Sequence, residues 1–312
     1  MSDRKYGLAV LGNCLVDVLR HVPAYPVQFN EAAGGEIVMP GGSGANTTYG
    51  FAVLGGKAVF MGKVANDAYG HFFKNDLESH GVDFPIAMYD STVSTAQCNV
   101  FITPDKERHF EADTSTNNLM TPEEIPADII ANSNMLLLES YFFDYPGQTD
   151  VLNKAVDIAR KSNTKIALTL GSLLCVQQNL EKIQNLIKGG LDILIGNETE
   201  FQGLTLCENF NDAAKTLRSL VASQTVNKIV ATLGGQGALL IGQNEEHHIP
   251  IFPTQKIDTT GAGDAFAAGL LRGLDDNRGL RAAGILGARS AAHVIARTGA
   301  RASDLHIVLK QA

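Results

Sequence analysis

The pattern of hydrophobic and polar positions predicts alternating strands and helices over the second half of the chain. From Ile129 onward, short apolar runs alternate with longer segments of helical period. This alternation is typical of right-handed βαβ units, so we predict an α/β fold with helices on both faces of a mostly parallel sheet. The expected strands read MLLLES, KIALTLG, LDILIGN, NKIVATLGG and GALLIG, with a loop at YFFDYP and helices over 150–162, 180–188, 200 onward and 212–222.

The first part of the chain adds elements of the same kind. The apolar runs YGLAVL and KAVFMGKV predict two further strands of the main sheet. Between Asp67 and His80 the apolar positions have helical spacing, and Gly81 ends that pattern. Residues 82–89 are expected to form another strand.

Two other segments predict a small sheet outside the main one. Residues 18–40 contain three prolines and no helical period. Residues 94–110 read as a hairpin with its turn at Thr103-Pro104-Asp105-Lys106. We expect one domain over 1–312, with a β-sheet lid formed by segments of approximately 14–40 and 94–113.

Two glycine-rich turns each open a helix. GGSGAN precedes TTYGFAVLGG, and DTTGAGDAF follows a short strand and opens an Ala-rich helix over 262–274. In the second turn, Thr259 or Thr260 is expected to cap the helix, while Gly261 and Gly263 let the backbone turn. The free N–H groups at this positive helix end would form an anion site. The last helix, 278–298, is also rich in Ala and Gly, so these two helices should pack closely.

Asp264 lies beside this expected anion site. A carboxylate there suits the removal of a proton from a hydroxyl that attacks a bound phosphoryl group. The same nine residues are equally compatible with a structural role, because Asp is favoured in a first helical turn without any catalytic function.

Other polar residues follow the expected strands, and ligands of open parallel sheets bind at the carboxyl ends of strands. Asn13 and Asp17 follow the first strand, and Thr232 with Gly234 follows a later one. Asn197 and Glu200 are three residues apart at a helix start, where they would share a face. That spacing suits Mg²⁺ and fits a capping arrangement equally well.

Composition, charge and the absence of certain motifs limit the classes of function that fit this chain. The formal net charge of −8 disfavours a nucleic-acid surface. No signal peptide or apolar run of membrane-spanning length is evident, and the four cysteines form no Cys-x-x-Cys pair, so we expect a cytoplasmic protein with free thiols. There is no G-x-x-x-x-G-K-[ST] motif, so a bound ATP would be held without a P-loop lysine.

The two glycine-rich motifs together resemble the signature pair of PfkB/ribokinase-type kinases. The resemblance extends over nearly the whole chain, through GKVANDAYGHFF, GNETE and GARSAAHVIARTGA. Within the family the chain is most similar to the adenosine kinase branch, through GNCLVD, DILIGNETE, the Thr-x-x-Cys around Cys98 and the terminal Arg-Thr-Gly.

This resemblance implies a Rossmann-like, ribokinase-like core with a β lid, and transfer of the γ-phosphate of ATP to a primary hydroxymethyl. Asp264 matches the family's catalytic base, and Gly261, Ala262 and Gly263 match its anion hole. The other implied residues are Asn13, Asp17, Gly42, Asn46, Cys98, Phe143 and Arg108 for the acceptor, Asn197, Thr232, Gly234 and Thr260 for ATP, and Asn197 with Glu200 for Mg²⁺.

Several points stay open at this stage. Phe142 or Phe143 would stack on a nucleobase or belong to the core, and Arg108 would reach a phosphate or be a surface charge. The segment Gly171-Ser172-Leu173-Leu174 departs from the adenosine kinase pattern, which leaves an adenosine-like nucleoside and a ribose- or fructose-like sugar as acceptors. An alternative function is that of a catalytically silent sensor that binds a nucleotide or a sugar. The sequence also leaves open whether a monovalent cation is required, and whether the protein is a monomer or a homodimer.

Overall fold

The main sheet confirms the α/β prediction. The computed structural model describes residues 4–25, 36–90, 93–105 and 107–311, except the side chains of 108, 110, 118 and 311. Within that part, the main sheet has the order β13-β12-β11-β10-β9-β8-β1-β4-β5, and only β12 and β13 run antiparallel to their neighbours. The strands are β1 Tyr6–Leu11, β4 Ala58–Met61, β5 Val82–Asp83, β8 Ser133–Glu139, β9 Lys165–Thr169, β10 Leu191–Asn197, β11 Val226–Thr232, β12 Ala238–Gly242 and β13 Glu246–Ile249.

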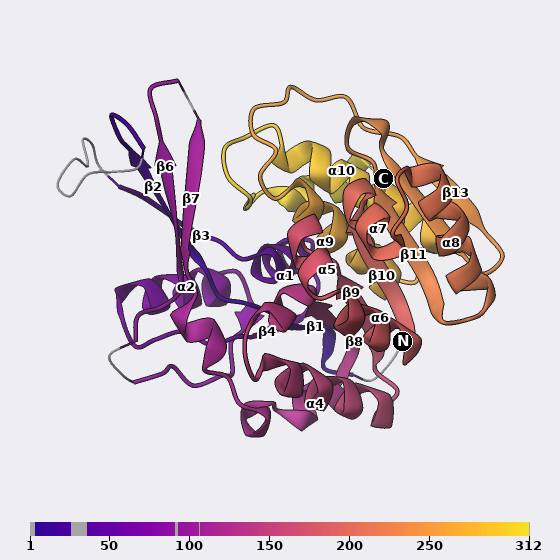
Figure 1. The fold of residues 1–312 in the computed structure, drawn as a ribbon, viewed down its shortest axis with the longest axis horizontal. Coiled ribbons are helices and arrows are strands. Elements are labelled where there is room, and N and C mark those ends of the chain that lie inside the picture. Colours follow the sequence, from indigo (N-terminus) through magenta and orange to yellow (C-terminus); the bar gives the residue numbers. More distant parts are fainter. Residues whose placement is uncertain (1–3, 26–35, 91–92, 106, 312) are drawn as a thin grey trace.

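Helices cover both faces of this sheet (Figure 1) because its strands are apolar on both sides. In β1, Ala9 and Leu11 belong to one buried cluster, whereas Leu8 and Val10 belong to the other. The first cluster is completed by α3 Ala127–Ala131, α4 Gln148–Lys161, α5 Leu173–Gln178, α6 Leu180–Lys188, α7 Glu198–Thr205 and α8 Phe210–Ala222. The second is completed by α1 Ser43–Val53, α2 Ala68–Ser79, α9 Ala262–Asp275 and α10 Leu280–Val294.

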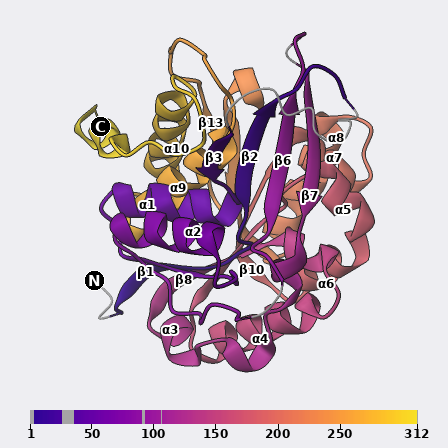
Figure 2. The same ribbon diagram turned by 90° about the vertical axis from the view of Figure 1, so that its left-hand side faces the viewer.

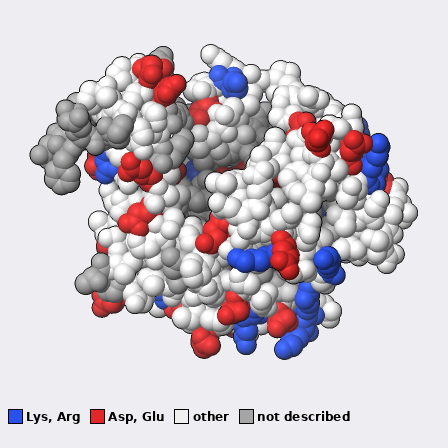
Figure 3. Space-filling view, viewed as in Figure 1, with Lys and Arg blue, Asp and Glu red and all other residues white. Residues whose placement is uncertain are grey.

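A separate small sheet rises beside this core (Figures 1 and 2). Its order is β3-β2-β6-β7, formed by β2 Val16–His21, β3 Ile37–Pro40, β6 Gln97–Ile102 and β7 Arg108–Asp113. β2 and β6 are parallel, and their register places Asp17 opposite Cys98. The predicted second sheet is therefore present, although residues 26–35 of the expected lid lie outside the described chain. In Figure 3 the surface is hollowed between this sheet and the core, and acidic and basic side chains are interspersed on that face.

Three local predictions were wrong. The strand expected over 82–89 ends at Asp83, because Pro85 has no N–H to continue the pairing. The expected loop at YFFDYP contains a 3₁₀ helix, Ser140–Asp144. Neither Thr259 nor Thr260 caps α9. Gly261 does so instead, with φ of 74°, in the left-handed region that favours glycine. In the described residues, no helix is long and apolar enough to cross a membrane.

The close packing of the last two long helices, α9 and α10, depends on glycine. A Cβ on Gly269 would lie 2.6 Å from Ser290 Oγ and 2.7 Å from the Leu286 carbonyl oxygen. That hydroxyl already donates to the same carbonyl over 2.8 Å, so neither group can move aside independently. Because α9 also carries Asp264, this contact helps to place the candidate site.

We expect Gly269→Ala to lower the free energy of unfolding by about 1–3 kcal/mol, because overpacking forces α9 and α10 apart. Gly235→Ala is the matched control. A Cβ there has no atom within 4 Å, so the change should stay within about 0.5 kcal/mol. Urea unfolding of both variants measures the difference, and equal stabilities would contradict this account of the packing.

Candidate active site

The carboxyl ends of the parallel strands and the start of α9 meet at one edge of the main sheet. A cavity of about 90 Å³ there is lined by Ser43, Thr47, Asn197, Glu200, Thr232, Gly263 and Asp264, among others. A second cavity, of about 560 Å³, is lined by Thr232, Gly234, Gly263, Phe252 and residues of α10. Thr232 and Gly263 line both cavities, so the two are neighbours at the first turn of α9.

The Asp264 carboxylate is held by the first turn of α1. Ser43 Oγ donates to Oδ1 over 2.6 Å, and Asn46 Nδ2 donates to Oδ2 over 2.9 Å. Burial raises the pKa of Asp264, and these two hydrogen bonds and the charge of Arg301 oppose that shift. The two glycine-rich motifs, far apart in sequence, are therefore joined by this one carboxylate.

The turn that was expected to bind an anion leaves some of its amides unpaired. Among the described residues, the N–H groups of Gly261, Gly263 and Asp264 form no hydrogen bond, whereas that of Ala262 donates to the Thr259 carbonyl over 3.2 Å. The expectation that the Ala262 amide is free was therefore wrong, because the turn closes on itself there. A Cβ on Gly263 would meet no atom within 4 Å, so space is open beside the free amides.

Four of the residues predicted to bind an acceptor lie on or next to the small sheet: Asn13, Asp17, Gly42 and Cys98. A Cβ on Gly41 would lie 2.7 Å from Asp17 Oδ2, and one on Gly42 would lie 2.6 Å from the Asn13 carbonyl oxygen. Asn13 Oδ1 is buried and has no partner among the described residues. Burial raises the pKa of Asp17 to about 6, against the opposing charge of Arg301. Burial likewise raises the pKa of the Cys98 thiol, to about 11.

Asn197 and Glu200 form a capping box at the start of α7. Asn197 Oδ1 accepts the Glu200 N–H over 2.9 Å, and Glu200 Oε2 accepts the Asn197 N–H over 2.8 Å. This is the capping alternative, and it accounts for their spacing without a metal. Both still line the smaller cavity, and Glu200 is 5% exposed. Within the described residues, no group of three His, Cys, Asp or Glu side chains is placed to hold a metal ion.

The structure gives a different outcome for each of three further predicted residues. Phe143 is 4% exposed and packs with Phe142 in the core, as in the core-aromatic alternative. The Thr260 hydroxyl donates to Asp258 Oδ1 over 2.7 Å and so is already engaged. Arg108 lies on β7, but its side chain is outside the described part of the chain.

Sequence reasoning missed Glu139, the last residue of β8. Glu139 Oε2 accepts the Asn13 N–H over 2.8 Å, and Oε1 accepts the Gly44 N–H over 2.7 Å. The side chain is 1% exposed, and burial raises its pKa to about 7. The sequence feature that could have identified Glu139 is its position directly after the apolar run MLLL, just as Asn197 directly follows LDILIG.

Arg301 was missed as well. Its Nε donates to Asn46 Oδ1 over 2.9 Å, so it contacts the residue that holds Asp264. It lies beyond the last long helix, in a segment with no local pattern, and only the fold brings it to the site.

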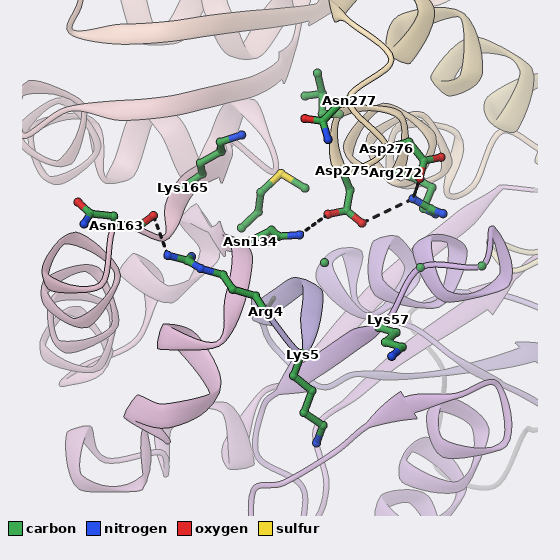
Figure 4. Close-up of a pocket in the computed structure, with 15 residues that line it drawn as sticks. Arg4, Lys5, Lys57, Asn134, Asn163, Lys165, Arg272, Asp275, Asp276 and Asn277 are labelled. Atoms are coloured by element: carbon green, nitrogen blue, oxygen red, sulfur yellow. Dashed lines mark hydrogen bonds and ion pairs between the residues drawn. The ribbon is translucent and has the colours of Figure 1, made fainter. Parts of the chain in front are cut away.

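A further cavity, of about 640 Å³, lies at the opposite edge of the sheet (Figure 4). Its charged groups are largely engaged with the protein. Arg4 donates to the Ser162 carbonyl and to the Thr164 hydroxyl, and Asp275 accepts from Asn134 and pairs with Arg272. None of the predicted site residues lines it, so we assign no role in the chemistry to this cavity.

Comparison with known proteins agrees with the fold and the motifs. The family model for pfkB family carbohydrate kinases matches residues 7–307. The chain is 28% identical to a probable fructokinase-3 of Arabidopsis thaliana over 89% of this chain and 80% of that protein. It is 29% identical to the adenosine kinase from Sinorhizobium meliloti, with a TM-score of 0.89 over 98% of this chain and 99% of that one. For a probable sugar kinase from Rhizobium etli CFN 42 the identity is 26%, the TM-score 0.89 and the coverage 99% and 98%. The chain therefore belongs to the pfkB family of carbohydrate kinases.

Proposed function

We propose that this protein transfers the γ-phosphate of ATP to a primary hydroxymethyl group, with Asp264 as general base. Membership of the family makes it a phosphotransferase that acts on a hydroxyl group of a sugar or a nucleoside. The observation that carries the assignment is the position of Asp264. Its carboxylate is fixed by Ser43 and Asn46, and Asp264 lies in the same first turn of α9 as the free N–H groups of Gly261 and Gly263.

The two neighbouring cavities suit two substrates. In this proposal the larger one holds ATP between Gly234 and α10, with the phosphates directed past Thr232 to the start of α9. The acceptor hydroxyl then lies between Asp264 and the terminal phosphate. Asp264 takes the hydroxyl proton as the oxygen bonds to phosphorus, which contributes roughly 10²–10⁴-fold to the rate. The free amides at the helix start stabilise the charge on the transferring group.

Mg²⁺ is implied by the use of ATP, and the oxygen atoms at this edge suit it. Asn197 and Glu200 are the residues that would hold it, through water, since Mg²⁺ keeps several waters in such sites. Bound Mg²⁺ would neutralise negative charge on the phosphates. Asn197 donates to both oxygens of the Glu200 carboxyl, from its backbone N–H and from Nδ2, and so holds this carboxyl in place.

Asp17 and Asn46 are proposed to bind a vicinal diol of the acceptor, and the small sheet is proposed to act as the lid. Asp17 lies on β2 of that sheet, whereas Asn46 lies on α1 of the core. A ligand held by both would draw the small sheet toward the main domain and exclude water, which would otherwise compete for the phosphoryl group.

The acceptor is proposed to be an adenosine-like nucleoside, in line with the likeness to an adenosine kinase. A sugar is the second candidate. It is favoured by the burial of Phe143, which removes the aromatic ring expected to stack on a base, and by the likeness to a fructokinase. Both acceptors offer the diol and the hydroxymethyl that the mechanism needs.

Replacement of the proposed base tests the mechanism. We expect Asp264→Asn to lower kcat by about 10²–10⁴-fold, because an amide cannot accept the proton. Asp212→Asn is the matched control, since Asp212 is also an acid in a first helical turn but is exposed on α8. Steady-state kinetics with ATP and the best acceptor measure both. Near-normal turnover by folded Asp264→Asn would show that the base is misassigned.

The acid side of the pH profile tests the diol partner. The raised pKa of Asp17, about 6, means that its carboxylate is lost as pH falls through 6. A protonated Asp17 accepts fewer hydrogen bonds from the diol, so kcat/KM for the acceptor should fall below about pH 6. Asp264, whose pKa is also raised, adds to the same acid limb. A kcat/KM that stays constant from pH 7.5 to pH 5 would contradict the role given to Asp17.

A panel of acceptors decides between the two candidates. Adenosine, ribose and fructose are compared by thermal shift in the presence of a non-hydrolysable ATP analogue, and by turnover with ATP. The nucleoside proposal predicts that adenosine stabilises the protein and is phosphorylated with the highest kcat/KM. Turnover of a sugar with no effect of adenosine would replace it with the sugar alternative.

A further inference from the structure

Arg301 is the most highly connected cation near the proposed site, and it comes from the C-terminal segment between α10 and the end of the chain. Its Nε donates to Asn46 Oδ1 over 2.9 Å, and its Nη2 donates to the Gly41 carbonyl over 3.1 Å. Its Nη1 pairs with Asp76 of α2. The guanidinium carbon lies 5.3 Å from the Tyr49 ring centre, and the Arg301 side chain is 8% exposed.

These contacts determine which way the Asn46 amide faces. An amide has one accepting end and one donating end, whereas a guanidinium only donates and an ionised carboxylate only accepts. With Arg301 beside it, Asn46 turns its Oδ1 to the guanidinium and its Nδ2 to Asp264 Oδ2, 2.9 Å away. With Arg301 removed, the amide keeps Asp264 as an orienting partner but loses the guanidinium that fixes its other end.

Arg301 also supplies the positive charge in a group of buried acids. It opposes the effect of burial on the pKa values of Asp17 and Asp264. The charged groups that face this region are Asp17 from β2, Asp76 from α2, Glu139 from β8, Glu200 from α7, Asp264 from α9 and Arg301 itself. The charge of Arg301 thus adds to the hydrogen bonds from Ser43 and Asn46 in opposing the rise that burial causes in the pKa of the proposed base.

We propose that Arg301 is a positioning residue, which orients the Asn46 amide and through it the Asp264 carboxylate, and which ties the turn at Gly41 below the small sheet to the same point. The inference rests on the proposed function, because it concerns the orientation of the proposed base. Arg301 touches neither the phosphoryl group nor the acceptor in this scheme. Its effect on the orientation of the Asp264 carboxylate passes through Asn46, whereas its effect on the pKa of that carboxylate is electrostatic.

Two substitutions separate its geometry from its charge. Arg301→Lys keeps the charge but loses the planar fork that reaches three acceptors, so kcat should fall by up to about 100-fold while the acid limb of the kcat profile stays in place. Arg301→Met loses both, so kcat should fall at least as far and the acid limb should move to higher pH. KM for ATP should change by less than about threefold in both, because the nucleotide cavity is not lined by Arg301.

A double variant tests whether the effect passes through Asn46. If it does, Asn46→Ala combined with Arg301→Met should have nearly the kcat of Asn46→Ala alone, because one interaction is removed twice. Multiplied losses would mean that Arg301 acts independently, and would overturn the inference.

Arg272→Met controls for the loss of a partly buried arginine. Arg272 donates to the Leu54 carbonyl over 3.1 Å, pairs with two aspartates and lies 5.9 Å from the Phe51 ring centre, at the opposite edge of the sheet. We expect Arg272→Met to be less stable to unfolding, with an unchanged kcat and an unchanged acid limb of the pH profile.

The outcomes distinguish this inference from the proposed function. Active Asp264→Asn would end the function as proposed. Inactive Asp264→Asn together with wild-type kcat and an unmoved acid limb in Arg301→Met would end only the role of Arg301. If Arg301→Met does not fold, Arg301→Lys decides, and an unchanged kcat in that variant contradicts the positioning role.

Discussion

The structure depends on one carboxylate that two separate helix starts share. Asp264 belongs to the first turn of α9, and both of its oxygens are held by the first turn of α1, through Ser43 and Asn46. These contacts fix the relative position of the two glycine-rich turns. Because one turn leaves amides free and the other lies below the small sheet, the same contacts set where a phosphoryl group and an acceptor can meet.

Burial of several acids at this edge is costly unless each has partners, since an ionised carboxylate loses its hydration there. Glu139 is satisfied by the backbone N–H groups of Asn13 and Gly44, and Asp264 by two side chains. Arg301 supplies the compensating charge. The raised pKa values at this edge follow from burial that these partners only partly offset. A site that must hold a base near neutral pH gains from such a balance.

Much of this arrangement could be predicted from the sequence because local pattern carries it. The apolar runs predicted the strands of the main sheet, and the Gly-rich motifs predicted the turns at which Asn46 and Asp264 lie. The strand predicted over 82–89 ends at Asp83, because Pro85 has no N–H with which to continue the pairing. Capping by Thr259 or Thr260 was wrong because Gly261 adopts the left-handed conformation instead.

Other features depend on contacts between distant segments, which local pattern does not reveal. Arg301 reaches Asn46 from 255 residues away, and Glu139 contacts two backbone N–H groups that belong to other elements. Phe143 has the residue type of a stacking ring, but packing places it in the core. Asn197 and Glu200 form the capping box of α7, and the same spacing would also suit a metal. The spacing alone therefore does not distinguish capping from metal binding.

The central claim is that Asp264 accepts a proton from a hydroxyl that attacks a phosphoryl group held by the amides beside it. A crystal structure with a non-hydrolysable ATP analogue and the acceptor tests this most directly. We expect the hydroxymethyl oxygen to lie within hydrogen-bonding distance of an Asp264 oxygen, and the terminal phosphate to lie against the N–H groups of Gly261 and Gly263. An acceptor hydroxyl remote from Asp264, or a terminal phosphate bound away from these amides, would contradict it.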